Sequence, residues 1–367
     1  MDELYIGLMS GTSCDGIDAC LVSFSNDEFN LIGSLYQAYP DEIRQSLLDL
    51  ISKQESCLDT LSILDHDLAA INTLAVKRLL QELNVRHDSV KAIGYHGQTI
   101  YHCPQDEHRN SMQIGDPSFL ATRASIPVVA DFRRMDMAVG GQGAPMVPGF
   151  HQYLFSNPVE TRAILNIGGI ANLTILPSFE TEDIIGFDTG PGNCLMDEWS
   201  LQHQQKPFDE NGDWAKQGSV IPELLKQLQQ DPYFAKPHPK STGREYFNQH
   251  WLAQKLTVEV KPQDVQASLA QLTANSISEA IKAYYGKIQH VFVCGGGAHN
   301  EFLLSLIQAQ LGPIKLDSTS ALGLAPDWVE ACAFAWLARQ RIEGLVGNIP
   351  SVTGANKPVI CGAVYQI

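Results

Sequence analysis

The chain has 367 residues, of which 44% are hydrophobic and 18% are charged. This length exceeds what one compact core holds and favours two domains, while the composition is that of a globular enzyme. The 41 acidic and 25 basic residues give a formal net charge of −16. Because such a surface repels nucleic acid and anionic lipid, we set polyanion-binding functions aside, although local positive sites would still accept a small anionic substrate.

Eight cysteines are spread along the chain without any C-x-x-C pair or metal-ligand spacing. We interpret them as reduced, mostly buried thiols. The N-terminal sequence MDELYIGLMSG lacks the basic flank and the apolar stretch of a signal peptide, and no apolar run is long enough to cross a bilayer. The sequence therefore predicts a soluble, cytoplasmic protein.

A hairpin is the first element that the sequence predicts, over residues 4–24, with a turn rich in Gly, Ser and Asp. Helical spacing of apolar residues then predicts helices at Asp41–Lys53 and 57–83. Shorter elements complete this part of the chain: strands at 91–99, 112–115 and 126–132, and a helix at 118–124. Residues 137–148, MAVGGQGAPMVP, are dense in Gly and Pro and indicate a loop at or near a domain boundary.

A second hairpin is predicted at 162–176, on the same plan as the first. The later elements follow in order: a strand ending in Asp188, a helix at 194–203, helical periods from about 220 to 285 broken by prolines, a buried strand at 290–294, a helix beginning near Asn300 and a helix at 327–341. The repeated hairpin suggests two related α/β halves. We expect domains at 1–135, rejoined by 350–367, and at 136–349.

Three glycine-rich segments could bind phosphate or a nucleotide. In the first, Gly11-Thr12-Ser13-Cys14-Asp15-Gly16, small residues allow backbone N–H groups to approach an anion, and Asp15 suggests a nearby Mg²⁺ or water. An ordinary tight hairpin is the alternative interpretation. The second, Asn166 to Asn172 with Gly168 and Gly169, is weak alone but forms a plausible pair of clamps with the first. The third, Gly295-Gly296-Gly297, follows a buried strand and would allow close approach of a flat ligand such as adenine.

Asp188 stands before the glycine turn Gly190-Pro191-Gly192. A carboxylate at the end of a strand in an α/β domain is well placed to accept a proton or to help hold Mg²⁺, and the next helix supplies amides for an anion. Capping of the turn or helix is the alternative role for Asp188. A dinucleotide fold is disfavoured, because Asn300 breaks the G-x-G-x-x-G spacing, and no P-loop motif is present.

Histidines and arginines give thinner signals. His96 and His102 lack metal-ligand spacing, and a single histidine is more often structural than catalytic. Arg123, Arg133 and Arg134 cluster near the predicted strands, where a guanidinium would suit a carboxylate, although exposure to solvent is the default for arginine.

Six motifs, taken in order, resemble the anhydro-N-acetylmuramic acid kinases. They are MSGTSCDGIDACLV, YHGQT, ADFRRMDMAVGGQGAPMVP, NIGGIANLT, GFDTGPGN and VCGGGAHN, and they span nearly the whole chain. That family belongs to the superfamily of acetate and sugar kinases, Hsp70 and actin. The resemblance implies an α/β fold of two ribonuclease-H-like, actin-like ATPase domains facing across a nucleotide cleft, with the helix at 327–341 as an interdomain connection.

The resemblance also implies a reaction in peptidoglycan recycling: ATP, water and 1,6-anhydro-N-acetylmuramic acid give ADP and N-acetylmuramic acid 6-phosphate. Asp188 matches the base that deprotonates water, Glu330 an acid that contacts the sugar, and Arg123 and Arg134 positions near the substrate. His96 is expected to bind the sugar as well. The residues expected to bind ATP are Gly11, Thr12, Ser13, Cys14, Asp15, Gly16, Ile17, Asp18, Asn166, Gly168, Gly169, Gly190, Gly192, Gly295, Gly296 and Gly297. Mg²⁺ is expected with ATP, near Asp15 or Asp188, and the protein is expected to be a homodimer.

Cys14 is a small departure from the family, which usually has an aliphatic residue there. Two other functions stay open: a kinase of the same fold for another amino sugar or small carboxylate, and a non-enzymatic nucleotide-gated module related to chaperones or actin. The ADFRR and GGQGAP segments favour the first-named sugar, and the absence of an appended peptide-binding domain disfavours the gated module.

Overall fold

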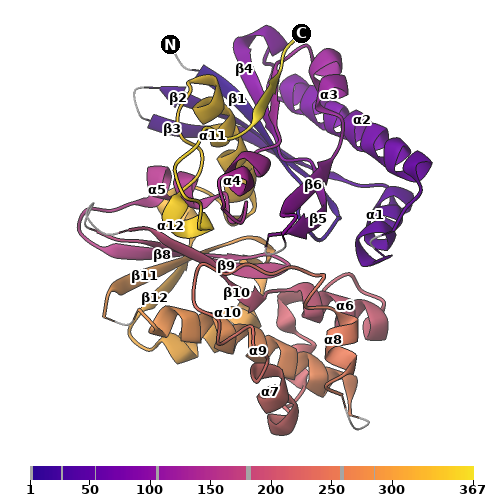
Figure 1. The fold of residues 1–367 in the computed structure, drawn as a ribbon. Helices are drawn as coiled ribbons and strands as arrows, with labels where there is room; N and C mark the ends of the chain where they lie inside the picture. Colours follow the sequence, from indigo (N-terminus) through magenta and orange to yellow (C-terminus); the bar gives the residue numbers. More distant parts are fainter. Residues whose placement is uncertain are drawn as a thin grey trace. The chain divides into compact units, whose positions relative to one another are not determined.

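The computed structural model describes residues 3–25, 28–53, 55–104, 107–178, 183–256, 260–284 and 286–367. The chain forms two compact units (Figure 1). Unit 1 comprises Met1–Leu154 and Asp327–Ile367, and unit 2 comprises Phe155–Pro326. In the described part of the chain, no helix combines the length and the apolar character needed to span a membrane.

Unit 1 is built on a six-stranded sheet in the order β13-β7-β4-β1-β2-β3. Strands β1, β2 and β3 are antiparallel neighbours, whereas β4 and β7 run parallel to β1. The strands of the sheet are β1 (Glu3–Met9), β2 (Gly16–Ser25), β3 (Glu28–Ala38), β4 (Val90–Tyr95), β7 (Val128–Ala130) and β13 (Ala363–Tyr365). A separate antiparallel pair consists of β5 (Gln98–Cys103) and β6 (Asn110–Ile114).

The two faces of this sheet differ because side chains alternate along each strand. Ile6 and Leu8 on β1 join the apolar core that also contains Leu68 and Val76 of helix α2. The intervening Gly7 faces helix α11, where an added Cβ would overlap the carbonyl oxygen of Ala331. The helices of unit 1 are α1 (Asp41–Lys53), α2 (Leu58–Glu82), α3 (Pro117–Ala124), α4 (Arg134–Ala138), α5 (Pro148–Phe155), α11 (Val329–Ile342) and α12 (Pro350–Thr353).

Glycines explain how α11 lies so close to the sheet. Gly7 and Gly94 are register partners on β1 and β4, and an added Cβ at Gly94 would overlap the carbonyl oxygen of Phe334. Nine residues of α11 are buried, so the helix is apolar on nearly all sides. The domains expected from the sequence, 1–135 with 350–367 and 136–349, have other boundaries than the compact units. Most of α4, most of α5 and all of α11 fall in unit 1, whereas the expected boundaries put them in the second domain.

Unit 2 repeats the sheet plan of unit 1. Its five strands lie in the order β10-β9-β8-β11-β12, with β8, β9 and β10 antiparallel and β11 and β12 parallel to β8. The strands are β8 (Thr161–Ile167), β9 (Ile170–Leu176), β10 (Ile185–Pro191), β11 (Ile288–Cys294) and β12 (Lys315–Ser318). Both sheets thus have a three-stranded meander followed by two parallel strands, as expected of two ribonuclease-H-like domains, and the hairpin repeat predicted from the sequence is confirmed.

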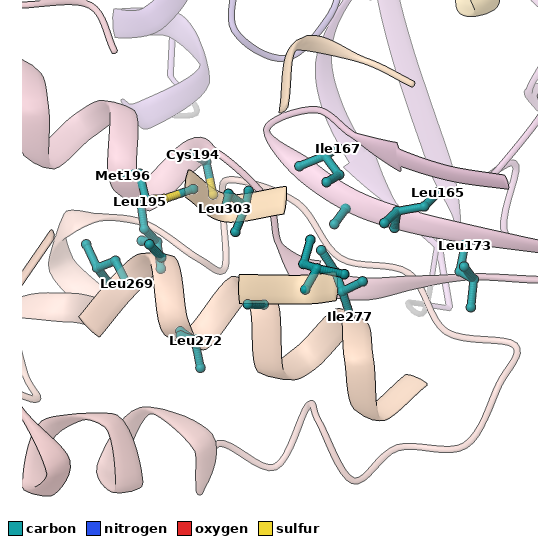
Figure 2. Close-up of a cluster of buried hydrophobic side chains, with 14 of the residues drawn as sticks. Leu165, Ile167, Leu173, Cys194, Leu195, Met196, Leu269, Leu272, Ile277 and Leu303 are labelled. Atoms are coloured by element: carbon teal, nitrogen blue, oxygen red, sulfur yellow. The ribbon is translucent and has the colours of Figure 1, made fainter. Parts of the chain in front are cut away.

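The core of unit 2 lies between its sheet and its helices (Figure 2). The cluster joins Leu165 and Ile167 of β8 with Leu269 and Leu272 of α9 and Leu195 of α6. The helices of unit 2 are α6 (Cys194–Gln204), α7 (Pro222–Gln229), α8 (Gln249–Ala253), α9 (Pro262–Lys282) and α10 (Glu301–Leu311).

Local patterns predicted many of these elements correctly. Helix α1 has the predicted bounds, and α2 begins after Cys57, whose side chain accepts a hydrogen bond from the Thr60 amide. Other predictions were wrong or incomplete. Strand β3 was missed. The long irregular segment between α7 and α8 contains the prolines that were expected to break the helical region predicted from 220 to 285. The predicted end of that region, Tyr285, lies outside the described residues.

Candidate functional site

The first glycine turn joins β1 to β2 in unit 1. The Cys14 amide donates to the Gly11 carbonyl over 3.3 Å, and Cys14 has a positive φ of 52°. The Ser13 hydroxyl donates to Oδ1 of Asp15 over 2.6 Å. Asp15 is exposed, so its carboxylate is open to a ligand or an ion.

This turn is braced by the bend between β4 and β5. The Ser10 hydroxyl donates to the Gly97 carbonyl over 3.0 Å, and the side-chain amide of Gln98 donates to the Gly11 carbonyl over 3.1 Å. Gln98 is 1% exposed and its Oε1 has no hydrogen-bond partner among the described residues. These two bonds fix the backbone at the start of the turn. Nothing in the sequence singles out Gln98 beyond its place in YHGQT.

Several carboxylates lie close to one another near this turn. Burial, together with the negative charges of Asp15, Glu330 and Asp327, raises the pKa of Asp18 to about 8. Asp18 lies on β2, and Glu330 lies in the first turn of α11. These two predicted site residues come from distant parts of the chain but are close enough to interact electrostatically. The described residues nevertheless contain no group of three or more His, Cys, Asp or Glu side chains arranged to hold a metal ion.

His96 contacts Arg133, which the sequence placed in the arginine cluster but the family resemblance did not assign to the substrate. The Arg133 guanidinium donates to Nε2 of His96 over 2.9 Å and to the Gly143 carbonyl over 2.7 Å. Since a guanidinium only donates, Nε2 accepts and the ring proton lies on Nδ1. Burial and the charge of Arg133 hold the pKa of His96 well below its usual value, so the ring is neutral. His96 is 5% exposed, and its predicted contact with a sugar stays a prediction.

The other two arginines contact residues of unit 1. Arg134 donates to the Ser111 carbonyl over 3.3 Å, and its Nε lies 3.6 Å from Oδ1 of Asp131. Arg123 stacks its guanidinium over the Phe119 ring, 5.3 Å from the ring centroid. Their proposed contacts with a carboxylate stay predictions.

In unit 2, Asp188 lies inside β10, because the strand continues to Pro191. The prediction that the strand ends at Asp188 was wrong, and the pairing with β9 shifts register just after this residue. The carboxylate Oδ2 accepts a hydrogen bond of 2.9 Å from the Thr242 amide. The backbone carbonyl of Asp188 accepts one of 2.8 Å from the Tyr233 hydroxyl. Asp188 is 8% exposed, so its carboxylate is oriented within a largely water-excluded setting.

Backbone bonds tie the second glycine turn to the turn after Asp188. The Gly192 and Cys194 amides donate to the Gly169 carbonyl over 2.9 and 3.1 Å, and the Asn193 amide donates to the Gly168 carbonyl over 2.8 Å. A Cβ at Gly192 would overlap that Gly168 carbonyl. The two turns predicted separately from the sequence therefore form one structure at the start of α6.

The third glycine segment reaches the same end of the sheet. Cys294 and Asn166 are register partners on the parallel strands β11 and β8, so the segments that follow them lie side by side. Gly295 has a φ of 77°, and an added Cβ there would overlap Oδ1 of Asn166. A Cβ at Gly297 would likewise overlap the Ile167 side chain. All three glycine segments of unit 2 thus converge, as expected for backbone amides that bind a nucleotide.

Sequence reasoning missed the segment that holds Asp188, residues 231–247. The segment was assigned to broken helices. In the structure its Thr242 amide binds the Asp188 carboxylate, and Tyr233 and Lys240 bind the Asp188 main chain. The run KPHPKSTG, with prolines too frequent for a helix, was the available signal for an ordered loop.

Known proteins resemble this chain over its full length. Residues 3–367 match the family model described as anhydro-N-acetylmuramic acid kinase. A protein of that name from Nitrosomonas europaea is 47% identical over 361 residues, which cover 98% of this chain and 99% of the relative. Relatives of the same name from Coxiella burnetii and Pasteurella multocida are each 46% identical, with alignments that cover 99% and 98% of this chain and 97% and 96% of theirs. The chain belongs to the anhydro-N-acetylmuramic acid kinase family.

Proposed function

We propose that this protein is an ATP-dependent kinase that hydrolytically opens 1,6-anhydro-N-acetylmuramic acid and phosphorylates O6, giving N-acetylmuramic acid 6-phosphate. Family membership supports the substrate. The observation that carries the mechanism is the Asp188 carboxylate, which is oriented by the Thr242 amide and stands beside the joined glycine turns of unit 2.

Asp188 acts as the general base. It takes a proton from a water molecule while the water oxygen forms a bond to C1 of the sugar and the bond from C1 to O6 breaks. The freed O6 then bonds to the γ-phosphorus of ATP, and ADP leaves. Because Asp188 is largely shielded from solvent and fixed by hydrogen bonds, the base needs little reorganisation before the proton moves.

The glycine segments are proposed to bind ATP. Backbone amides of the turns at 11–16 and 168–169 suit the phosphates, and Gly295, Gly296 and Gly297 suit the adenosine.

Mg²⁺ is proposed to neutralise the phosphates, and Asp15 and Asp18 fit it in donor chemistry. Magnesium prefers carboxylate oxygens, and a cation would offset the burial and the neighbouring negative charges that raise the pKa of Asp18. Since the described residues form no complete cage, one or two of these carboxylates would act together with ATP oxygens and water.

Sugar recognition is assigned to four side chains. Glu330 is proposed to orient the sugar and the attacking water, while Arg123 and Arg134 would bind the lactyl carboxylate through their guanidinium groups. His96 is proposed as a further sugar contact, although its neutral ring also positions Arg133. We further propose that the protein is a cytoplasmic homodimer that acts in peptidoglycan recycling.

Incubation with ATP, Mg²⁺, the anhydro sugar and ¹⁸O-labelled water tests the reaction. We expect a phosphorylated product that carries one solvent oxygen at C1, detected by mass spectrometry. Better turnover of N-acetylmuramic acid or glucosamine would instead favour a kinase for another sugar. ATP hydrolysis without a phosphorylated sugar would favour a nucleotide-gated module.

Asp188→Asn tests the base. The amide keeps the shape but accepts no proton, so we expect turnover to fall by several orders of magnitude while nucleotide affinity changes little. Asp213→Asn, at an exposed position of the same unit, is the matched control. Near-normal turnover by the Asp188 variant would exclude this role.

A further inference from the structure

Lys240 is a buried lysine whose role is not explained by packing alone. It lies in the irregular segment between α7 and α8 and is 9% exposed. Among the described residues, its Nζ makes long hydrogen bonds, 3.4 Å to the carbonyls of Tyr233 and Phe234. Burying an ammonium group is costly unless nearby charge compensates it.

Two aromatic rings from residues that adjoin Asp188 lie near this ammonium group. Nζ lies 4.8 Å from the centroid of the Tyr233 ring and 5.8 Å from that of Phe187. Tyr233 donates its hydroxyl to the Asp188 carbonyl, and Phe187 precedes Asp188 in β10. The faces of aromatic rings attract cations, so both rings favour the charged lysine at this place.

The backbone fixes Lys240 relative to Asp188 as well. The Asp188 amide donates to the Lys240 carbonyl over 3.1 Å, and two residues further on the Thr242 amide donates to the Asp188 carboxylate. Residues 240–242 therefore bind both the main chain and the side chain of Asp188, and the backbone of Lys240 is held beside this residue.

Neighbouring charges act on the pKa of Lys240 in opposite directions. Burial lowers the pKa of Lys240, the negative charge of Asp188 opposes that shift, and the positive charge of Lys236 adds to it. Lys236 is exposed and lies over the same Tyr233 ring, 5.7 Å from its centroid. Tyr233 itself stays neutral, because burial and Asp188 raise its pKa.

We propose that Lys240 is a positioning residue whose positive charge keeps the Asp188 carboxylate ionised and ready to accept the proton of the attacking water. This inference rests on the proposed role of Asp188 as the base. A carboxylate this well buried would otherwise hold its own proton more tightly, and a protonated base would be inactive.

The test is the pH profile of kcat/KM for Lys240→Met, which removes the charge and keeps the apolar stem. We expect the acidic limb to move to higher pH by about one unit, because the carboxylate loses a neighbouring cation. Lys240→Arg should keep the wild-type limb. Lys236→Met removes a charge from the solvent side of the same ring and should leave the profile unchanged. An unmoved limb in Lys240→Met, or an equal fall in rate at every pH, would overturn the proposal.

A second measurement, the NMR titration of Lys240 itself, does not depend on whether a variant without the lysine charge folds. In protein carrying [ε-¹³C]lysine, the Lys240 signal is assigned by its loss in Lys240→Arg, and its titration is followed by NMR. We expect Asp188→Asn to lower the pKa of Lys240, since the favourable negative charge is gone, and an unchanged titration would contradict the proposal. Failure of the proposed function is distinguishable, because it would appear as no phosphorylated anhydro-sugar product from the wild-type protein.

Discussion

The buried carboxylate of Asp231 allows a quantitative test of what holds the segment around Asp188. Asp231 is 6% exposed and accepts three hydrogen bonds. Oδ1 accepts from the Tyr233 amide over 2.9 Å and from the Tyr246 hydroxyl over 2.8 Å, and Oδ2 accepts from Nε1 of Trp251 over 2.8 Å. These bonds join both ends of the segment that contains Lys240 and Thr242.

Asp231→Asn leaves one acceptor oxygen for three donors. If the amide oxygen keeps the bonds from Tyr233 and Tyr246, the NH₂ group faces the Trp251 N–H, and two buried donors oppose each other. Loss of a hydrogen bond to a charged group, with the partner left unsatisfied, predicts a destabilisation of about 3 kcal/mol. In a Trp251→Phe background the opposing donor is absent, so the same change should cost about 1 kcal/mol. The expected coupling energy is therefore about 2 kcal/mol.

Urea unfolding followed by far-UV circular dichroism measures this coupling in four proteins: the wild type, the two single variants and the double variant. Circular dichroism is preferred because Trp251→Phe alters fluorescence. A coupling energy below about 0.5 kcal/mol would refute the reasoning, since it would mean that the Trp251 bond adds little to stability.

Two further predictions concern unit 1. Gly7→Ala should lower the free energy of unfolding by about 3 kcal/mol in urea titrations, because the new methyl group meets the α11 backbone. The control Gly33→Ala meets the Leu83 side chain, which can move, and should cost less. Equal costs for the two variants would contradict this reasoning. Asp18→Asn should raise the thermal midpoint of the ligand-free protein, increasingly from about pH 4 to pH 8. The folded wild type, whose Asp18 pKa is raised to about 8, loses stability as pH rises through that window, by at most about 1.4 kcal/mol per unit, whereas asparagine does not titrate. A difference in midpoint that is constant with pH would count against the carboxylate cluster.

Local sequence was enough to predict elements whose cause is local. The apolar spacing of α2 and the start of a helix near Asn300 were predicted from the sequence, and the structure has both. The repeated hairpins also predicted two α/β units, because a strand, glycine turn and strand is a pattern of neighbouring residues. The long motifs identified the family for the same reason.

Only the tertiary structure decided which distant residues share a charge environment. Asp18 and Glu330 come from opposite ends of the chain and interact because α11 packs against β1 and its neighbours. Lys240 lies 52 positions after Asp188, and nothing in its own sequence context shows that its chain folds back over that strand. The sequence by itself determined most of the elements and the chemistry of the motifs. The partners of Asp188 and the protonation of Asp18 were decided by the fold, because hydrogen bonding and desolvation depend on distances in space.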